Sequence, residues 1–211
     1  MTITHHPATD TLAAYAAGSL DTARRLVVAS HIERCAACRA TVGNFEAVGG
    51  AMLTDLPPAP MEPDALARVL ARIDGVPAAS PAHAMNAHSD LPACLHSCTL
   101  GEWRWIGPGL RVRPVALPQA GKARLFLLKG APGARLPHHR HTGEEFAAVL
   151  TGAYAHEGGR FGPGDFDEAD AATEHTPVVT ADAECICLIA LEGRVRMTGL
   201  AGALLNPFVR I

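Results

Sequence analysis

The stretch from Gly133 to Gly152 reads Gly-Ala-Arg-Leu-Pro-His-His-Arg-His-Thr-Gly-Glu-Glu-Phe-Ala-Ala-Val-Leu-Thr-Gly and carries the most specific pattern of the chain. His139 and His141 are separated by one residue, so both side chains point to the same face if the segment is a strand. Glu145 follows a Thr142-Gly143 turn that can bring its carboxylate back to the same point. Two imidazoles and a carboxylate directed at one point predict a bound divalent metal ion.

The sequence around this stretch predicts short strands. Apolar or alternating runs occur at 124–128, 146–150, 176–179 and 185–190, with glycine and proline between them. Several short runs of this kind, separated by turn residues, favour an all-β barrel or sandwich. A later strand must then bring a further ligand across the barrel, and His175 is the candidate.

The spacing Gly133-x5-His139-x-His141-x3-Glu145-x6-Gly152 resembles the first motif of the metal-binding cupins at every defined position. The resemblance implies a double-stranded β-helix, which is an antiparallel β-barrel, with the metal ligands His139, His141, Glu145 and His175. The adjacent Glu144 is an alternative that only the spacing disfavours. A solvated, histidine-rich loop is the other interpretation, but the two framing glycines argue against it.

The second motif of that family is only partly present. Gly164-Asp165 begins it, but Asp170–Glu174 replaces the usual Pro-x-Gly before His175. The set of ligands suits zinc or another divalent transition metal, and the ligand types alone do not choose between them.

The N-terminal third predicts helices. Asp10 is placed to cap a first helix that Gly18 ends, and Ser19 to cap a second that runs to about Cys35. A third must stop before Leu56, where a proline-rich segment begins.

A fourth helix is predicted to begin at Pro63 and to end at Gly75. Its apolar residues recur at i, i+3, i+4 and i+7, which makes one continuous stripe along the helix. The residues of this stripe, called the apolar stripe below, are Leu66, Val69, Leu70 and Ile73. Such a stripe has to be buried against something.

A second ligand pattern, His31-x3-Cys35-x2-Cys38, lies between the second and third predicted helices. His31 and Cys35 share one helix face, and the two residues before Cys38 allow a turn that brings a second sulfur to the same point. Cys-x2-Cys alone fits zinc, redox chemistry or chance packing, and His31 one helical turn upstream favours tetrahedral zinc. The fourth ligand would be His5 or His6.

The series Leu12-x2-Tyr15-x2-Gly18-x-Leu20, followed by the His/Cys pattern, resembles the zinc-binding anti-sigma domain. That family sequesters bacterial sigma factors of the extracytoplasmic-function group. The resemblance implies three helices around a zinc ion, with His6 as the fourth ligand, and a looser fourth helix that docks on the sigma factor.

Both halves together resemble the ChrR-like anti-sigma factors, including the C-terminal Asn206-Pro-Phe-Val-Arg-Ile. The implied protein is α+β and multidomain: a zinc-stapled helical bundle at 1–76, a linker at 77–93 and a cupin domain at 94–211. The resemblance implies a regulator, not an enzyme, that releases its sigma factor when the cupin senses photo-oxidative stress such as singlet oxygen.

The alternative is a dioxygenase-like cupin metalloenzyme with a helical appendage. A substrate-sized pocket with an acid/base pair near the metal would favour the enzyme. A closed site of four ligands without a cavity would favour the regulator.

Composition excludes some partners. The formal charge of the 211 residues is −3, and no basic cluster lies between Arg24 and Arg39, which argues against direct nucleic-acid binding. No apolar run of about 18 residues and no signal peptide occur, so we expect a cytoplasmic protein without a membrane segment. The oligomeric state stays open.

Four further cysteines lie outside the His/Cys pattern. Cys185 and Cys187 alternate on a predicted strand and are expected to be core residues, with oxidation as the alternative. Cys94 and Cys98 follow the predicted linker and are either free thiols or a pair that oxidises.

Overall fold

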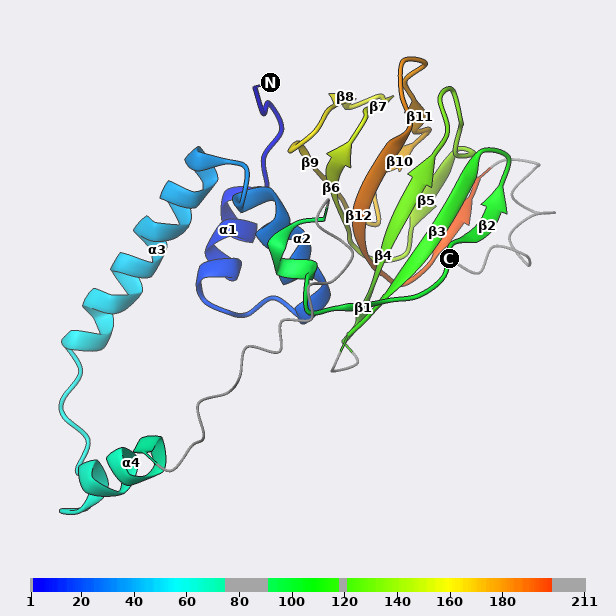
Figure 1. Cartoon of the computed structure of the whole chain (residues 1–211). Coiled ribbons are helices and arrows are strands. Elements are labelled where there is room, and N and C mark those ends of the chain that lie inside the picture. Colours follow the sequence, from blue (N-terminus) through cyan, green and yellow to red (C-terminus); the bar gives the residue numbers. More distant parts are fainter. Residues whose placement is uncertain (1, 75–90, 118–120, 199–211) are drawn as a thin grey trace.

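The computed structural model describes residues 2–74, 91–117 and 121–198 (Figure 1). Most of the predicted linker, the predicted helix end at Gly75 and the C-terminal Asn206–Ile211 lie outside these residues. The helices are α1 (Thr9–Ala16), α2 (Thr22–Ile32), α3 (Ala36–Thr54), α4 (Ala65–Asp74) and the 3-10 turn η1 (Ala93–Leu95). The strands are β1 (Thr99–Leu100), β2 (Arg104–Gly107), β3 (Leu110–Ala116), β4 (Ala123–Gly130), β5 (His139–His141), β6 (Glu145–Thr151), β7 (Tyr154–His156), β8 (Gly159–Phe161), β9 (Phe166–Ala169), β10 (Glu174–His175), β11 (Val178–Val179), β12 (Cys185–Glu192) and β13 (Val195–Met197).

The helices occur in the predicted places, but α2 ends at Ile32 rather than near Cys35, α4 begins at Ala65 rather than at Pro63, and two caps differ. α1 begins before Asp10, which therefore lies in the first turn, and no side chain caps this helix. α2 is capped by Asp21, whose carboxylate accepts a hydrogen bond of 3.0 Å from the amide of Arg24, and not by Ser19. Gly18 ends α1 as predicted, in the left-handed conformation with φ of 67°.

The strands form three antiparallel sheets. The large sheet has the order β1-β3-β4-β12-β6-β9, with β2 beside β3. Two smaller sheets, β10-β5-β13 and β11-β7-β8, complete the barrel predicted from the sequence. In the register of β10 and β5, His175 is paired directly with His139.

The central strand of the large sheet, β12, is buried on both faces. On β12, Cys187 and Ile189 pack into the barrel interior, whereas Leu188 and Ala190 face the helices. A strand buried on both faces reads as a continuous apolar run rather than an alternating one, which accounts for residues 185–191.

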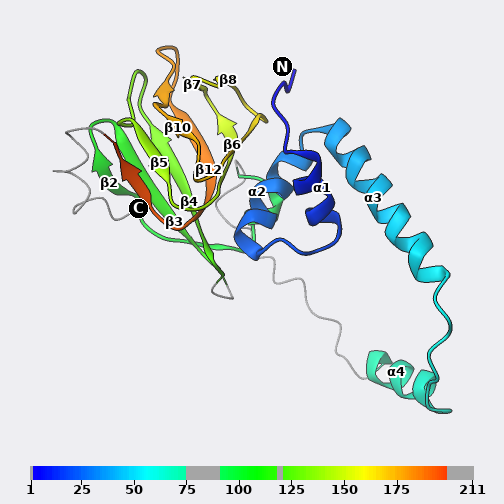
Figure 2. The same cartoon turned by 180° about the vertical axis from the view of Figure 1, so that it is seen from behind.

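α2 packs on this sheet against β4, β6 and β12, so that it lies between the sheet and α3 (Figures 1 and 2). Val27 and Val28 have no exposed surface and share one apolar core with Leu125, Phe146 and other sheet residues. The three helices around the His/Cys pattern are therefore not stabilised by their own small core alone.

The end of the predicted linker also contacts α2. Both carboxylate oxygens of Glu33 accept hydrogen bonds of 2.9 Å, from the amides of Ala93 and Cys94. Leu95 is 1% exposed in the shared core. The segment after residue 90 thus binds the helices before it enters the barrel.

α4 stands apart from the rest of the molecule (Figure 1). The apolar stripe is exposed along its whole length, with 70%, 51%, 51% and 63% of the surface of Leu66, Val69, Leu70 and Ile73 accessible. Among the described residues, no helix is long and apolar enough to cross a membrane.

Candidate metal centres

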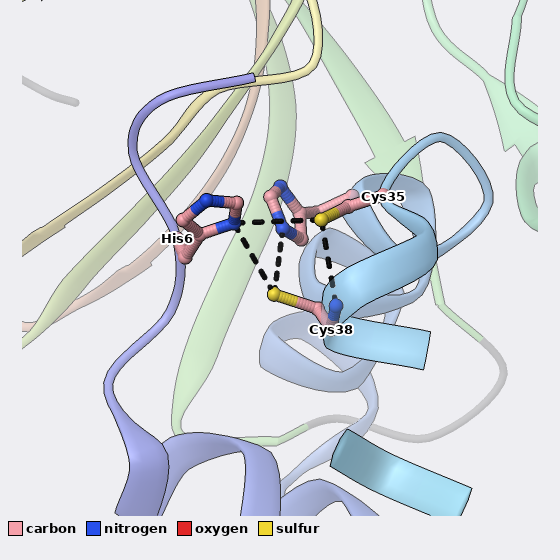
Figure 3. Close-up of side chains that lie close together, drawn as sticks. His6, Cys35 and Cys38 are labelled. Carbon is pink, nitrogen blue, oxygen red and sulfur yellow. Dashed lines mark hydrogen bonds between the residues drawn. The ribbon is translucent and has the colours of Figure 1, made fainter. Parts of the chain in front are cut away.

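Four side chains near the N-terminus place one ligand atom each within 4.8 Å of one another: His6, His31, Cys35 and Cys38, called the His/Cys cluster below. Nε2 of His31 lies 3.3 Å from Sγ of Cys38. Nδ1 of His6 lies 3.4 Å from Sγ of Cys35 and 3.3 Å from that of Cys38 (Figure 3). The structure thus brings together all four residues predicted for this site.

Local structure explains three of these positions. His31 lies in the last turn of α2, and the chain turns before α3 begins. Cys35 is the residue that caps α3, and its sulfur accepts a hydrogen bond from the amide of Cys38 at 3.4 Å. The helix start therefore directs both sulfurs to the side on which His31 lies.

The His/Cys cluster fits a zinc ion. Tetrahedral zinc with bonds of about 2.3 Å to sulfur and 2.0–2.1 Å to nitrogen separates these atoms by about 3.6 Å, close to the spacing found here. Cys35 and Cys38 are each 4% exposed. Burial raises the pKa of the Cys38 thiol to about 12, so that a thiolate needs a cation beside it.

The choice between His5 and His6 depends on tertiary structure. The ring of His5 packs against that of Phe161 in a tilted arrangement with centroids 4.2 Å apart, and its Nδ1 lies 3.6 Å from a carboxylate oxygen of Asp165. It points to the barrel, whereas the ring of His6 points to the two sulfurs (Figure 3).

A second cluster of His139, His141 and His175, called the cupin cluster, lies inside the barrel. Nε2 of His175 is 3.0 Å from that of His139 and 3.1 Å from that of His141. Nitrogen atoms about 3.0 Å apart are expected for three ligands on one face of an octahedral ion with bonds of about 2.1 Å. The cupin cluster therefore also fits a divalent transition metal.

The environment keeps these imidazoles neutral, the form that binds metals. Burial, and after it the neighbouring imidazoles of His139 and His175, lowers the pKa of His141 to about 3. Burial likewise lowers the pKa of His175 to about 4. Nδ1 of His139 donates to the carbonyl of Pro137 at 2.7 Å, which leaves its Nε2 free to bind a metal.

Glu145 lies beside the cupin cluster but not within it. One carboxylate oxygen is 3.7 Å from Nδ1 of His141, on the far side of that ring from His175. Burial, then the charge of Asp167, raises the pKa of Glu145 to about 8. Glu144 points to solvent and lies 3.4 Å from the guanidinium of Arg24. Of the two neighbours, only Glu145 faces the interior, and its role as a ligand stays a prediction.

The sequence patterns missed a group next to the cupin cluster. His156, Asp167 and His175 place their ligand atoms within 4.8 Å of one another. Asp167 accepts hydrogen bonds from His156 at 2.9 Å and from the hydroxyl of Tyr154 at 2.7 Å. The sequence carries no signal for this group, since neither Asp167 nor His156 belongs to a motif position.

The cupin cluster opens on a cavity of about 1110 Å³ inside the barrel. Its wall is mostly apolar, with Leu110, Phe126 and Val179 among its residues, and polar groups gather at the cluster. A substrate-sized cavity is the feature that favours the enzyme over the regulator, so the cavity by itself argues for the alternative function.

The remaining cysteines are free thiols. The sulfurs of Cys185 and Cys187 lie 3.7 Å apart, buried in the cavity wall. Cys94 packs against α2, and burial followed by the charge of Glu33 raises its pKa to about 12. Oxidation at either pair stays a prediction.

Fold and clusters together define a class of protein in which a helical His/Cys domain is joined to a cupin. A family model described as the ChrR cupin-like domain matches residues 95–193, and a second, described as a zinc finger, matches residues 7–39. The anti-sigma-E factor ChrR of Cereibacter sphaeroides is 40% identical over 214 residues, which cover 100% of both chains. The crystal structure of Rhodobacter sphaeroides SigE in complex with the anti-sigma ChrR superimposes with a TM-score of 0.76 at 38% identity, over 90% of this chain and 100% of that chain.

The chain belongs to the ChrR family of anti-sigma factors. It is a regulator rather than an enzyme, and the alternative of a cupin metalloenzyme is set aside. The cavity next to the cupin cluster consequently needs an explanation other than turnover of a substrate.

Proposed function

We propose that this protein sequesters a sigma factor of the extracytoplasmic-function group through its N-terminal helices, in the cytoplasm, and releases it when the cupin domain senses a signal. Photo-oxidative stress, singlet oxygen in particular, or a related stress is the proposed signal. The His/Cys cluster holds zinc, and the cupin cluster, with Glu145, holds zinc or another divalent transition metal.

The exposed apolar stripe of α4 carries the proposal. Half or more of the surface of each of its four side chains is accessible, and the opposite face bears Arg68, which pairs with Asp64 at 3.7 Å. An amphipathic helix with an unburied apolar face is suited to lie in a groove of a partner protein. Exposed apolar residues also occur at the end of α3, among them Met52 and Leu53.

Binding to the sigma factor encoded beside its gene tests the proposal. Leu66→Glu combined with Leu70→Glu should weaken binding about 100-fold or more, since it places charges at the centre of an apolar contact. Arg68→Ala, on the opposite face of α4, is the matched control and should leave the dissociation constant unchanged. No association of zinc-loaded protein with the sigma factor would overturn the proposal.

The cavity supports the sensing role of the cupin. A largely apolar cavity with a few converging polar groups is the usual form of a small-molecule site. The proposal predicts that oxidant treatment of the purified complex releases the sigma factor, and that a full-length variant carrying His139→Ala and His141→Ala no longer releases it on this treatment. Equal release from both proteins would exclude the cupin as the sensor.

A further inference from the structure

The turn between β8 and β9, residues 162–165, reaches out of the barrel to the His/Cys cluster. The carbonyl of Gly164 accepts a hydrogen bond of 2.7 Å from Nδ1 of His31, and the imidazole is fully buried. With its proton on Nδ1, the ring presents an unprotonated Nε2 to the sulfur of Cys38. A residue of the barrel therefore selects the tautomer of a zinc ligand in the helical domain.

Glycine is required at this position of the turn. Gly164 has φ of +92°, and a Cβ atom there would lie 2.8 Å from the side chain of Ile3. Its amide donates to the carbonyl of Val149 at 2.8 Å, which ties the turn to β6. The carbonyl that faces His31 is thus held by the barrel rather than by the helices.

The same turn also holds the segment that leads to His6. One oxygen of Asp165 accepts hydrogen bonds from the amides of Thr4 at 2.7 Å and His5 at 3.0 Å. The other oxygen accepts from the amide of Gly162 at 2.8 Å, and the amide of Phe166 donates to the carbonyl of His5 at 3.1 Å. Asp165 is 4% exposed, so these contacts are shielded from water.

Strand β9 follows this turn, and one of its two faces lines the cavity. Asp167, two residues after Asp165, points into the barrel and binds His156 and Tyr154. Between them, Phe166 packs on the ring of His31 with centroids 5.7 Å apart. A single short strand therefore contacts both metal clusters.

We propose that Asp165 and the Gly164 carbonyl are positioning residues for the zinc site, which hold His6 and His31 in place so that metal retention by the helical domain depends on the barrel. The inference rests on the proposed zinc occupancy of the His/Cys cluster. It goes beyond that proposal because residues of the barrel domain position two of the four zinc ligands.

Metal loss from the full chain tests this inference. The protein, tagged at its C-terminus, is loaded with cobalt and mixed with excess EDTA, and the decay of the thiolate-to-cobalt absorption is followed. The cupin cluster consists of imidazoles, so this absorption reports the His/Cys cluster. Asp165→Asn places an NH2 group against backbone amides and should speed metal loss about tenfold, the usual scale for outer-shell residues.

Glu168→Gln is the matched control. Glu168 also joins the barrel to the helical domain, by accepting hydrogen bonds from the amide of Ala8 at 3.1 Å and the hydroxyl of Thr11 at 2.6 Å, but it holds no residue next to a cluster ligand. Its substitution should leave the rate unchanged. Equal rates for Asp165→Asn and the unsubstituted protein, or equal acceleration by Glu168→Gln, would overturn the inference.

A second variant covers the case in which Asp165→Asn does not fold. Thr4→Pro removes one amide that donates to Asp165 and alters only the segment before α1, so the barrel stays intact. It should also speed metal loss, and an unchanged rate in this variant would overturn the inference on its own. Absence of the thiolate-to-cobalt band in the unsubstituted protein would instead reject the zinc site itself.

Discussion

His175 lies directly opposite His139 across the β5–β10 pair, with their Nε2 atoms 3.0 Å apart. The pairing of these two strands places His175 at the cluster, although the cupin motif that precedes it is only partly present. A two-residue strand holds the histidine, and its partner strand supplies both of the other imidazoles.

We expect His175→Ala to remove the metal of the cupin cluster and to leave that of the His/Cys cluster in place, because the latter uses no barrel side chain as a ligand. Metal content per chain after dialysis measures this. His138→Ala is the control, since His138 is exposed and adjacent to the cluster. Loss of both metals from the His175→Ala variant would show that the two clusters do not bind metal independently.

We expect Glu145→Gln to weaken metal binding by the cupin cluster about 10- to 100-fold, whether Glu145 binds the ion or orients His141. Glu144→Gln should have no effect, because that carboxylate points to Arg24 at the surface. Competition with a chelator of known affinity gives the two dissociation constants. A larger effect from Glu144→Gln would reverse the assignment of the two neighbours.

Zinc binding to the metal-free protein should release about two protons at the His/Cys cluster, since zinc binds thiolates and the buried Cys38 thiol is protonated at neutral pH. Titration calorimetry in buffers of different ionisation enthalpy counts these protons. A Cys35→Ser, Cys38→Ser double variant measures the protons released when zinc binds to the cupin cluster alone. No dependence on the buffer would show that the ligands are not thiolates.

We expect urea to unfold α2 and the barrel in one transition, because Val28 belongs to the same core as the sheet. Val28→Ala should lower the free energy of unfolding by about 2 kcal/mol, by loss of buried methyl groups. Arg25→Ala, on the exposed side of α2, should change it by less than about 0.5 kcal/mol. Two separate transitions, with Val28→Ala affecting only the first, would show that the helices fold independently.

Local periodicity was enough to predict much of this protein. One-residue spacing places His139 and His141 on one face of a strand, because this relation depends only on backbone geometry. The spacing of four also brings Cys35 to His31 although α2 ends at Ile32, since the amide of Cys35 still donates to the carbonyl of His31 at 2.9 Å. The apolar stripe of α4 follows from the same geometry. Its exposure, with at least half of each side chain accessible, is a finding of the structure.

Only tertiary structure decided the relations between distant segments. Asp165 holds the chain so that His6, and not His5, reaches the sulfurs. Asp167 lies next to the cupin cluster, beside His175, without belonging to a motif. α2 shares its core with the sheet. These depend on which strands become neighbours and how the helices pack on them. No local spacing encodes these contacts, because the residues that make them are far apart in the sequence. Asp165 and His5, for example, are 160 positions apart.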